Sequence, residues 1–197
     1  MHEELSPHGF TVISVALDRS PDDARPWIEA ARPTHPALVD TAYTVADLYN
    51  MVNVPTTVWI DEQGTIVRPN DVGYATDTFR SLTRIDSARV LDSLRAWVRD
   101  GTCTIDGDEA RALQAPVTEE HQLARAHFAL ARWLLAQGRG DAAEQHFLRA
   151  GELAPHDFTI RRGSMPMRGI DSMGPQLGAM VADWVQRGNP YYRPLPK

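Results

Sequence analysis

The sequence predicts a mixed α/β unit followed by an all-helical region. Two apolar runs rich in β-branched residues, "FTVISVALD" at 10–18 and "TTVWID" at 56–61, are typical of buried strands. Segments with helical periodicity lie between and after these runs, so we expect the order β-α-β-α-β-β-α over residues 1–101. From residue 124 onward the apolar positions follow a helical period only.

Each element of the first half has a local signal. In "SPDDARPWIEAAR", Ser20 is a suitable N-cap and Pro21 a suitable first helical residue. "PALVD" predicts a short strand and "TAYTVADLYNMV" a helix. "TTVWID", the turn "EQG" and "TIVRP" predict an antiparallel hairpin. "DSARVLDSLRAWVRDG" then closes the domain at 1–101 as an amphipathic helix that ends at Gly101, and 102–123 is a connecting segment.

The composition limits the classes of function. The chain has 197 residues and a net charge of −6, which argues against a nucleic-acid-binding surface. No apolar run approaches the length of about 18 residues that a membrane span needs, and no signal peptide is recognisable at the N-terminus. We therefore expect a soluble protein, cytoplasmic as given, with no nucleic-acid partner and no membrane partner.

The segment "VNVPTTVWIDEQGTIV", together with the element order, resembles the thioredoxin superfamily. The extra helix and short strand after the first strand are similar to those of TlpA/ResA-like thiol-disulfide oxidoreductases and the related AhpC/TSA peroxiredoxins. The resemblance implies that Pro55 is a cis-proline, and that the backbone of Val54 pairs with a bound substrate chain beside Thr56. Without the resemblance, Pro55 would be an ordinary trans proline at the start of a strand.

The redox motif of that family is missing. Its members carry Trp-x-x-Cys-x-x-Cys at the start of a helix, and "MHEELSPHG" matches only the end of that helix. The single cysteine, Cys103, lies in the loop "DGTCTIDGD" beyond the closing helix and cannot replace either motif cysteine. We therefore expect no catalytic residue in the chain as given, although the family acts on protein or small-molecule thiols and disulfides.

The resemblance also implies a missing first strand, which would lie between the strands at 10–18 and 56–61. Those two strands would then carry unpaired backbone groups along one edge each. Either another segment or subunit fills this position, or the natural polypeptide is longer than the sequence given, which is the alternative we prefer. A selenocysteine codon read as a stop would produce a start near Met1.

The segment "ARAHFALARWLLAQGRGDAAEQHFLRAGELAPHD" at 124–157 is similar to one tetratricopeptide repeat, which has a period of about 34 residues. Small and apolar residues occupy its packing positions: Leu130, Ala131, Leu134, Ala143, Phe147 and Ala150. Gly138 lies in the turn and Pro155 ends the repeat. Residues 158–197 are predicted to hold a capping helix at Gly178–Gly188 and a tail. We expect the helical half as a whole to pack on the first half and not to form a free solenoid.

Arg125, Phe128 and Arg132 share one face of the first repeat helix. This face is a candidate site for an acidic or C-terminal peptide, through which a protein partner would bind. The alternative is a solvated helix face.

No metal or cofactor site is predicted. Four methionines suggest Cu(I) ligands, but their spacing is irregular and no His or Cys completes a site: Met165, Met167, Met173 and Met180. His121 and His127 lie on different helix faces, and His146 is expected to face away on the next helix. The functional prediction is therefore a thioredoxin-like protein, inactive in thiol exchange as given; the alternative is a redox-inactive adaptor that binds a peptide through its helical half.

Overall fold

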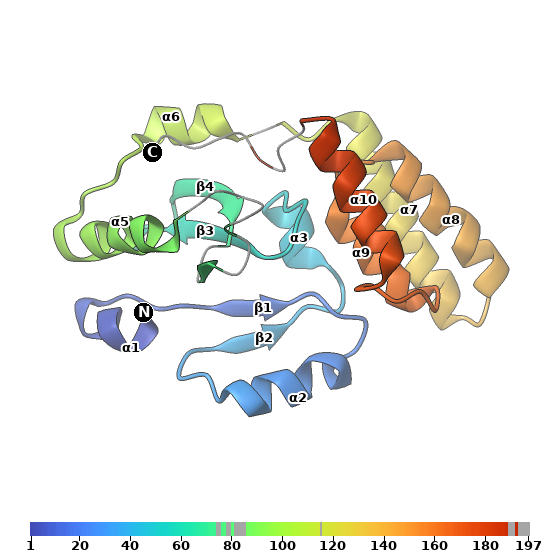
Figure 1. Ribbon diagram of the computed structural model, residues 1–197, viewed down its shortest axis with the longest axis horizontal. Coiled ribbons are helices and arrows are strands. Elements are labelled where there is room, and N and C mark those ends of the chain that lie inside the picture. Colours follow the sequence, from blue (N-terminus) through green and yellow to red (C-terminus); the bar gives the residue numbers. More distant parts are fainter. Residues whose placement is uncertain (74–75, 78–79, 81–85, 115, 189–191, 193–197) are drawn as a thin grey trace.

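The computed structural model describes residues 1–73, 76–77, 80, 86–114, 116–188 and 192 (Figure 1). The fold is mixed α/β, mostly helical with small sheets. A short helix α1 (His2–Leu5) and the turn η1 (Ser6–His8) come first. The next elements follow in the order that the sequence predicts: β1 (Ser14–Ala16), α2 (Pro21–Ala31), β2 (Ala37–Val39), α3 (Thr44–Leu48), β3 (Thr56–Ile60), β4 (Ile66–Val72) and α5 (Ser87–Asp100).

Local signals set the ends of two of these helices. The Ser20 side chain accepts a hydrogen bond from the Asp22 amide at the start of α2, as an N-cap does. Gly101 ends α5 with a φ of 67°, a left-handed conformation that glycine adopts without strain. Both predictions are confirmed.

The four strands form two separate sheets. β1 pairs in parallel with β2, with Ser14 opposite Ala37, and β3 pairs antiparallel with β4, with Thr56 opposite Val72. From bottom to top, Figure 1 shows β2, β1, β3 and β4, so the unpaired edges of β1 and β3 face each other. With one described neighbour only, β1 is shorter than the predicted strand at 10–18.

The rest of the described chain is helical. After α6 (Gly107–Leu113) come two pairs of helices: α7 (Glu119–Ala136), α8 (Gly140–Leu153), α9 (Phe158–Met167) and α10 (Pro175–Gln186). α7 begins before residue 124 because Thr118 caps it, accepting a hydrogen bond from the His121 amide. Residues 158–197 therefore hold two described helices, where the sequence predicted one capping helix.

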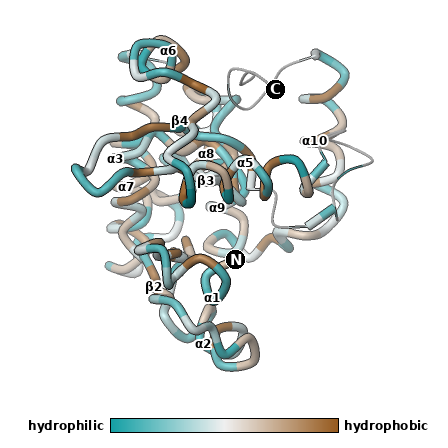
Figure 2. The backbone as a smooth tube through the Cα atoms, turned by 90° about the vertical axis from the view of Figure 1, so that its left-hand side faces the viewer, coloured by the Kyte–Doolittle hydropathy of each residue, from teal (hydrophilic) through white to brown (hydrophobic). Residues whose placement is uncertain are grey.

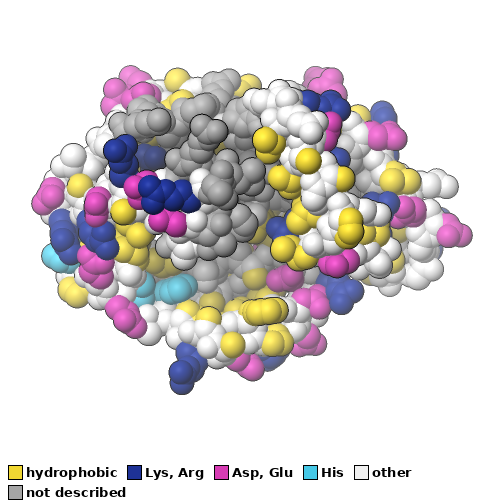
Figure 3. Space-filling view, viewed as in Figure 1, with side chains coloured by type: hydrophobic (Ala, Val, Ile, Leu, Met, Phe, Trp, Pro, Cys, Tyr) yellow, Lys and Arg dark blue, Asp and Glu magenta, His cyan; other side chains and the backbone are white. Residues whose placement is uncertain are grey.

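The missed helix, α9, has a visible cause. The Asp157 carboxylate accepts hydrogen bonds from the amides of Thr159 and Ile160, which makes it a strong N-cap. Arg161 and Arg162 lie inside this helix. Figure 3 shows hydrophobic side chains exposed over α10, where Val185 is 49% exposed and no residue is fully buried.

One hydrophobic core runs through both halves. Four alanines at the contact of α7 with α8 are at most 1% exposed, so the helices approach closely: Ala124, Ala131, Ala143 and Ala150. The rings of Phe128 and Phe147 lie 5.9 Å apart in this contact. Tyr43, beside α3, packs edge-on against Phe128 at 5.0 Å and extends the core into the first half.

The helices are amphipathic in character. Figure 2 shows hydrophilic and hydrophobic residues interspersed along them. None of the helices that the structure describes combines the length and the apolar character needed to cross a bilayer.

Candidate functional site

The helix face predicted to bind a peptide contacts the first half of the same chain. Arg132 donates hydrogen bonds to the carbonyl oxygens of Thr41 and Ala42, and its guanidinium lies 4.9 Å from the Tyr43 ring. Phe128 is only 4% exposed. Because α7 packs on the α3 side of the molecule, this face is used within the chain and does not offer a free surface.

Arg125 makes a second set of contacts between the halves. It donates to the Asn50 side chain at 2.7 Å and to the Asp47 carbonyl at 3.2 Å, and it lies 3.3 Å from the Asp47 carboxylate. Burial raises the pKa of Asp47, and the Arg125 charge opposes that effect. Arg125 and Arg132 therefore act as structural links between the two halves.

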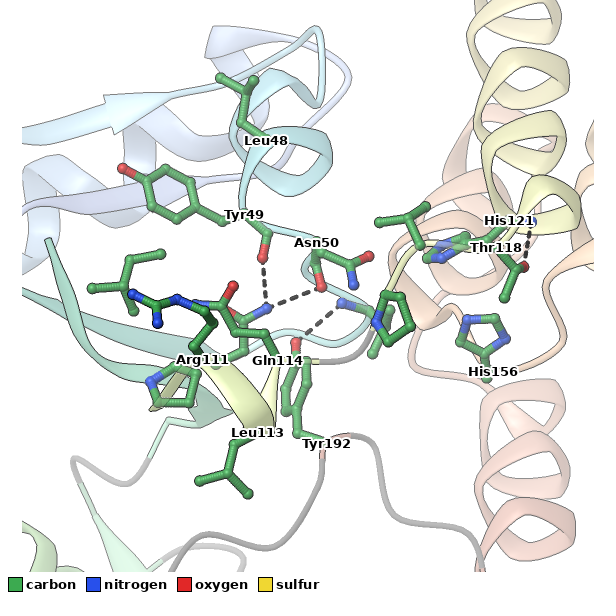
Figure 4. Close-up of a pocket in the computed structure, with 16 residues that line it drawn as sticks. Leu48, Tyr49, Asn50, Arg111, Leu113, Gln114, Thr118, His121, His156 and Tyr192 are labelled. Carbon is green, nitrogen blue, oxygen red and sulfur yellow. Dashed lines mark hydrogen bonds between the residues drawn. The ribbon is translucent and has the colours of Figure 1, made fainter. Parts of the chain in front are cut away.

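A pocket of about 660 Å³ lies where the β3–β4 hairpin, α6 and the helical half meet (Figure 4). Leu48, Tyr49 and Asn50 form one wall at the end of α3. Thr118 and His121, at the start of α7, lie on the opposite side in Figure 4 with His156. Arg111, Leu113, Gln114 and Tyr192 line the remaining side.

Tyr192 connects this pocket to the Pro55 turn, which we define as residues 52–55. Its hydroxyl oxygen accepts hydrogen bonds from the amides of Val52 at 3.0 Å and Asn53 at 3.2 Å. The Thr56 hydroxyl donates to the Asn53 carbonyl, so the Tyr192 hydroxyl donates its own proton to Thr56, 2.6 Å away. Burial raises the pKa of Tyr192.

Within the part of the chain that the structure describes, the Pro55 turn presents backbone groups without a hydrogen-bonding partner. The Val54–Pro55 peptide bond is cis, as the resemblance implies. The Pro55 carbonyl accepts a hydrogen bond from the Gly73 amide at 2.9 Å, which joins the turn to the end of β4. Val54 is 45% exposed, and its amide and carbonyl make no hydrogen bond with any other described residue.

Two histidines, His121 and His156, line one side of the pocket. His121 Nε2 lies 2.7 Å from the carboxylate of Asp157, which is fully buried at the start of α9. The His156 ring packs edge-on against His121, with 4.7 Å between ring centroids. Burial, and then the neighbouring His121, lower the pKa of His156, so its imidazole is neutral near pH 7 and can accept a hydrogen bond.

Sequence reasoning compared His121 only with His127 and His146, and it did not consider His156, which lies 35 residues further along the chain. The N-cap signal of Asp157 is the one local clue, since it places His156 directly before a helix. The helix α9 and the start of α7 then bring the three side chains together.

The single thiol lies away from the Pro55 turn. Cys103 donates a hydrogen bond to the Val67 carbonyl of β4, whereas the Pro55 turn lies beside Val72 at the other end of that strand. Five residues of extended strand span about 17 Å. Cys103 is not among the described residues that line the pocket, whose walls combine apolar side chains with hydrogen-bonding groups.

The methionines do not gather into a site either. Met165 is 5% exposed in the core, while Met173 is 71% exposed and its sulfur accepts a hydrogen bond from Arg162. Within the described residues no group of three or more His, Cys, Asp or Glu side chains is arranged to hold a metal ion. No family model, curated protein or solved structure matches this chain.

Proposed function

We propose that this chain is a thioredoxin-like binding protein that holds an extended peptide segment against its Pro55 turn. The single observation that carries the proposal is the free peptide group of Val54. Val54 is exposed, and its amide and carbonyl have no hydrogen-bonding partner among the described residues. It directly follows Val52 and Asn53, whose amides donate hydrogen bonds to the Tyr192 hydroxyl.

An extended peptide suits this arrangement for a physical reason. Its backbone offers both an N–H and a C=O group, which is what an exposed strand-like edge pairs with. Alternate side chains of such a peptide point to one side. We expect that side to face the pocket, because Val52 of the Pro55 turn also lines the pocket. Leu48, which is 77% exposed at the rim, offers apolar contact, and His156 offers a hydrogen-bond acceptor.

The remainder of the fold supports the same proposal. The order of elements from β1 to α5 is that of the thioredoxin-like pattern, with β1 and β3 left in separate sheets. The α7–α8 hairpin, with its buried alanines, is tetratricopeptide-like in character and packs on the first half through Arg125 and Arg132. The helical half thus completes the pocket, and we place the bound peptide at the Pro55 turn and not on that face of α7.

Thiol-disulfide exchange is the second candidate. The separation of β1 from β3 favours it, because that is where the family's first strand, which leads into the redox motif, would lie. This activity needs two thiols, or a thiol and a selenol, that the sequence given does not contain.

The peptide proposal is tested by selection from a displayed library of random peptides, followed by NMR with the selected peptides. We expect the backbone amide signals of Asn53, Val54 and Thr56 to shift on binding. The turn at Gln63 and Gly64, at the opposite end of the hairpin, serves as the internal control and keeps its signals. Bound peptides that leave the Pro55 turn unperturbed would contradict the proposal.

A reductase assay distinguishes the two candidates. Insulin reduction by this chain should equal the rate without protein, and Cys103→Ala should change nothing. A rate above that background would favour thiol exchange.

A further inference from the structure

The structure brings His127 of α7 and His146 of α8 into direct contact, where the sequence predicted that His146 faces away. Each histidine directly precedes a phenylalanine of the core, Phe128 and Phe147, and those rings also contact each other. Because α7 and α8 run antiparallel as a hairpin (Figure 1), the neighbours of a contacting pair meet as well. The Nδ1 atoms of the two histidines lie 2.7 Å apart.

We propose that His127 and His146 form a two-imidazole site for a divalent transition-metal ion, with Zn²⁺ as the reference ion. Two nitrogens bound to one tetrahedral Zn²⁺ lie about 3.3 Å apart, given the usual Zn–N bond length. Rotation of partly exposed side chains is enough to widen the present 2.7 Å contact by that amount. The ring centroids are 4.9 Å apart, the ring planes differ by 30°, and the Nδ1 atoms lie on the sides of the rings that face each other.

The protons on the two rings can be rearranged so that a metal ion replaces the hydrogen bond between the Nδ1 atoms. In the contact, one Nδ1–H donates to the other Nδ1, so one ring already presents a lone pair. When the metal binds, the donor ring moves its proton from Nδ1 to Nε2 through solvent, and both rings stay neutral. No net proton is released, and water completes the coordination of the ion.

The surroundings set the strength of binding. Arg149, one helical turn from His146, is the charged group whose field reaches His127. It forms an ion pair with Glu152 at 3.0 Å, which reduces its repulsion of a cation. Because the described residues supply two ligands only, we expect moderate affinity, with Cu²⁺ binding more tightly than Zn²⁺.

Two other histidine pairs lack this geometry. His2 and His35 pack edge-on with 5.7 Å between centroids, and no nitrogen–nitrogen contact joins them. His121 uses its Nε2 for Asp157 and meets His156 only edge-on. Among the described histidines, His127 and His146 are therefore the pair with nitrogens directed at each other.

The test is a Zn²⁺ titration of the full chain, freed of any affinity tag, in competition with a chromophoric chelator. His127→Ala and His146→Ala should each raise the Kd for Zn²⁺ at least about tenfold. His35→Ala is the matched control and should leave the Kd unchanged. In long-range ¹⁵N spectra of the parent, Zn²⁺ should shift the Nδ1 signals of both histidines.

His146→Gln provides a second variant in case the alanine disturbs the hairpin, because it keeps a polar side chain at a partly exposed position. Circular dichroism confirms that each variant keeps its helix content. Equal Zn²⁺ affinity in the parent and in both histidine variants, or ¹⁵N shifts confined to other histidines, would overturn the proposal.

Discussion

At the scale of single residues, hydrogen bonds between distant parts of the chain decide the shape of the candidate site. The Tyr192 hydroxyl satisfies two backbone amides of the Pro55 turn that would otherwise have no acceptor. Asp157 similarly satisfies the first amides of α9 with one oxygen and orients His121 with the other. Each side chain thereby fixes a backbone segment and a wall of the pocket at once.

Tyr192→Phe should lower the free energy of unfolding by about 1–3 kcal/mol, because it removes the acceptor of the amides of Val52, which is buried, and Asn53, which is partly buried. Urea denaturation followed by tryptophan fluorescence measures this change. Tyr49→Phe is the control, since the Tyr49 hydroxyl makes no hydrogen bond with the described residues, and its effect should stay within about 0.5 kcal/mol. Equal effects of the two substitutions would contradict the role given to Tyr192.

Sequence reasoning works at this scale only where the partners are close in the chain. The caps of Ser20 and Gly101 were predictable because an N-cap or C-cap interacts with residues a few positions away. The Tyr192 contact joins residues 140 apart, and nothing in the local pattern indicates it. The His127–His146 contact was misjudged because the two helices were considered one at a time.

At the scale of elements, the α7–α8 hairpin depends on small side chains at the helix contact. Ala131 is fully buried against α8, whereas Ala129, two residues earlier, lies on the exposed face of α7. The same residue type thus has two roles on one helix. At the contact an alanine sets the distance between helices, and on the exposed face it only favours the helical conformation.

Ala131→Leu should therefore lower the free energy of unfolding by about 1–3 kcal/mol, because the added carbons have no room between α7 and α8. Ala129→Leu adds the same atoms on the solvent side and should change stability by less than about 0.5 kcal/mol. Chemical denaturation monitored by circular dichroism compares the two. If Ala131→Leu were as stable as Ala129→Leu, the hairpin would not be close-packed at this position.

The elements were predictable to different degrees for a physical reason. Strands and helices with regular apolar spacing were found in their correct order, since one buried face produces that spacing. α9 was missed because its sequence, "FTIRRGSMPM", mixes a glycine, a proline and arginines with its apolar residues. Its core contacts through Ile160 and its cap at Asp157 offset that weak local preference.

At the scale of the whole molecule, the two halves share one core and one pocket. Tyr43 and Ala46 from the first half belong to the same buried cluster as the alanines of α7 and α8. Burial raises the pKa of Tyr43 to about 12, which keeps its phenol neutral between the halves. The sequence predicted that the helical half packs on the first half. It left Arg125, Phe128 and Arg132 as either a candidate peptide site or a solvated helix face, because charge and exposure were inferred from one helix alone.

Arg132→Ala should loosen the first half from the helical half while leaving the helices folded. The substitution removes charged hydrogen bonds to Thr41 and Ala42 and the contact with Tyr43, at a cost of about 1.5–3 kcal/mol. Hydrogen exchange read by mass spectrometry should then speed up over residues 41–48 and remain slow in α8.

Arg187→Ala is the control for this experiment, because Arg187 forms an ion pair with Asp183 on the surface of α10, where both side chains are more than half exposed. Exposed pairs of this kind contribute little to stability. Uniform acceleration across both halves in Arg132→Ala would mean that the chain unfolds as a single unit. Selective acceleration at 41–48 would instead show that the contact between the halves opens at a lower free energy than the helices unfold. That contact lies beside the pocket, because the pocket wall at 48–50 comes from the same segment.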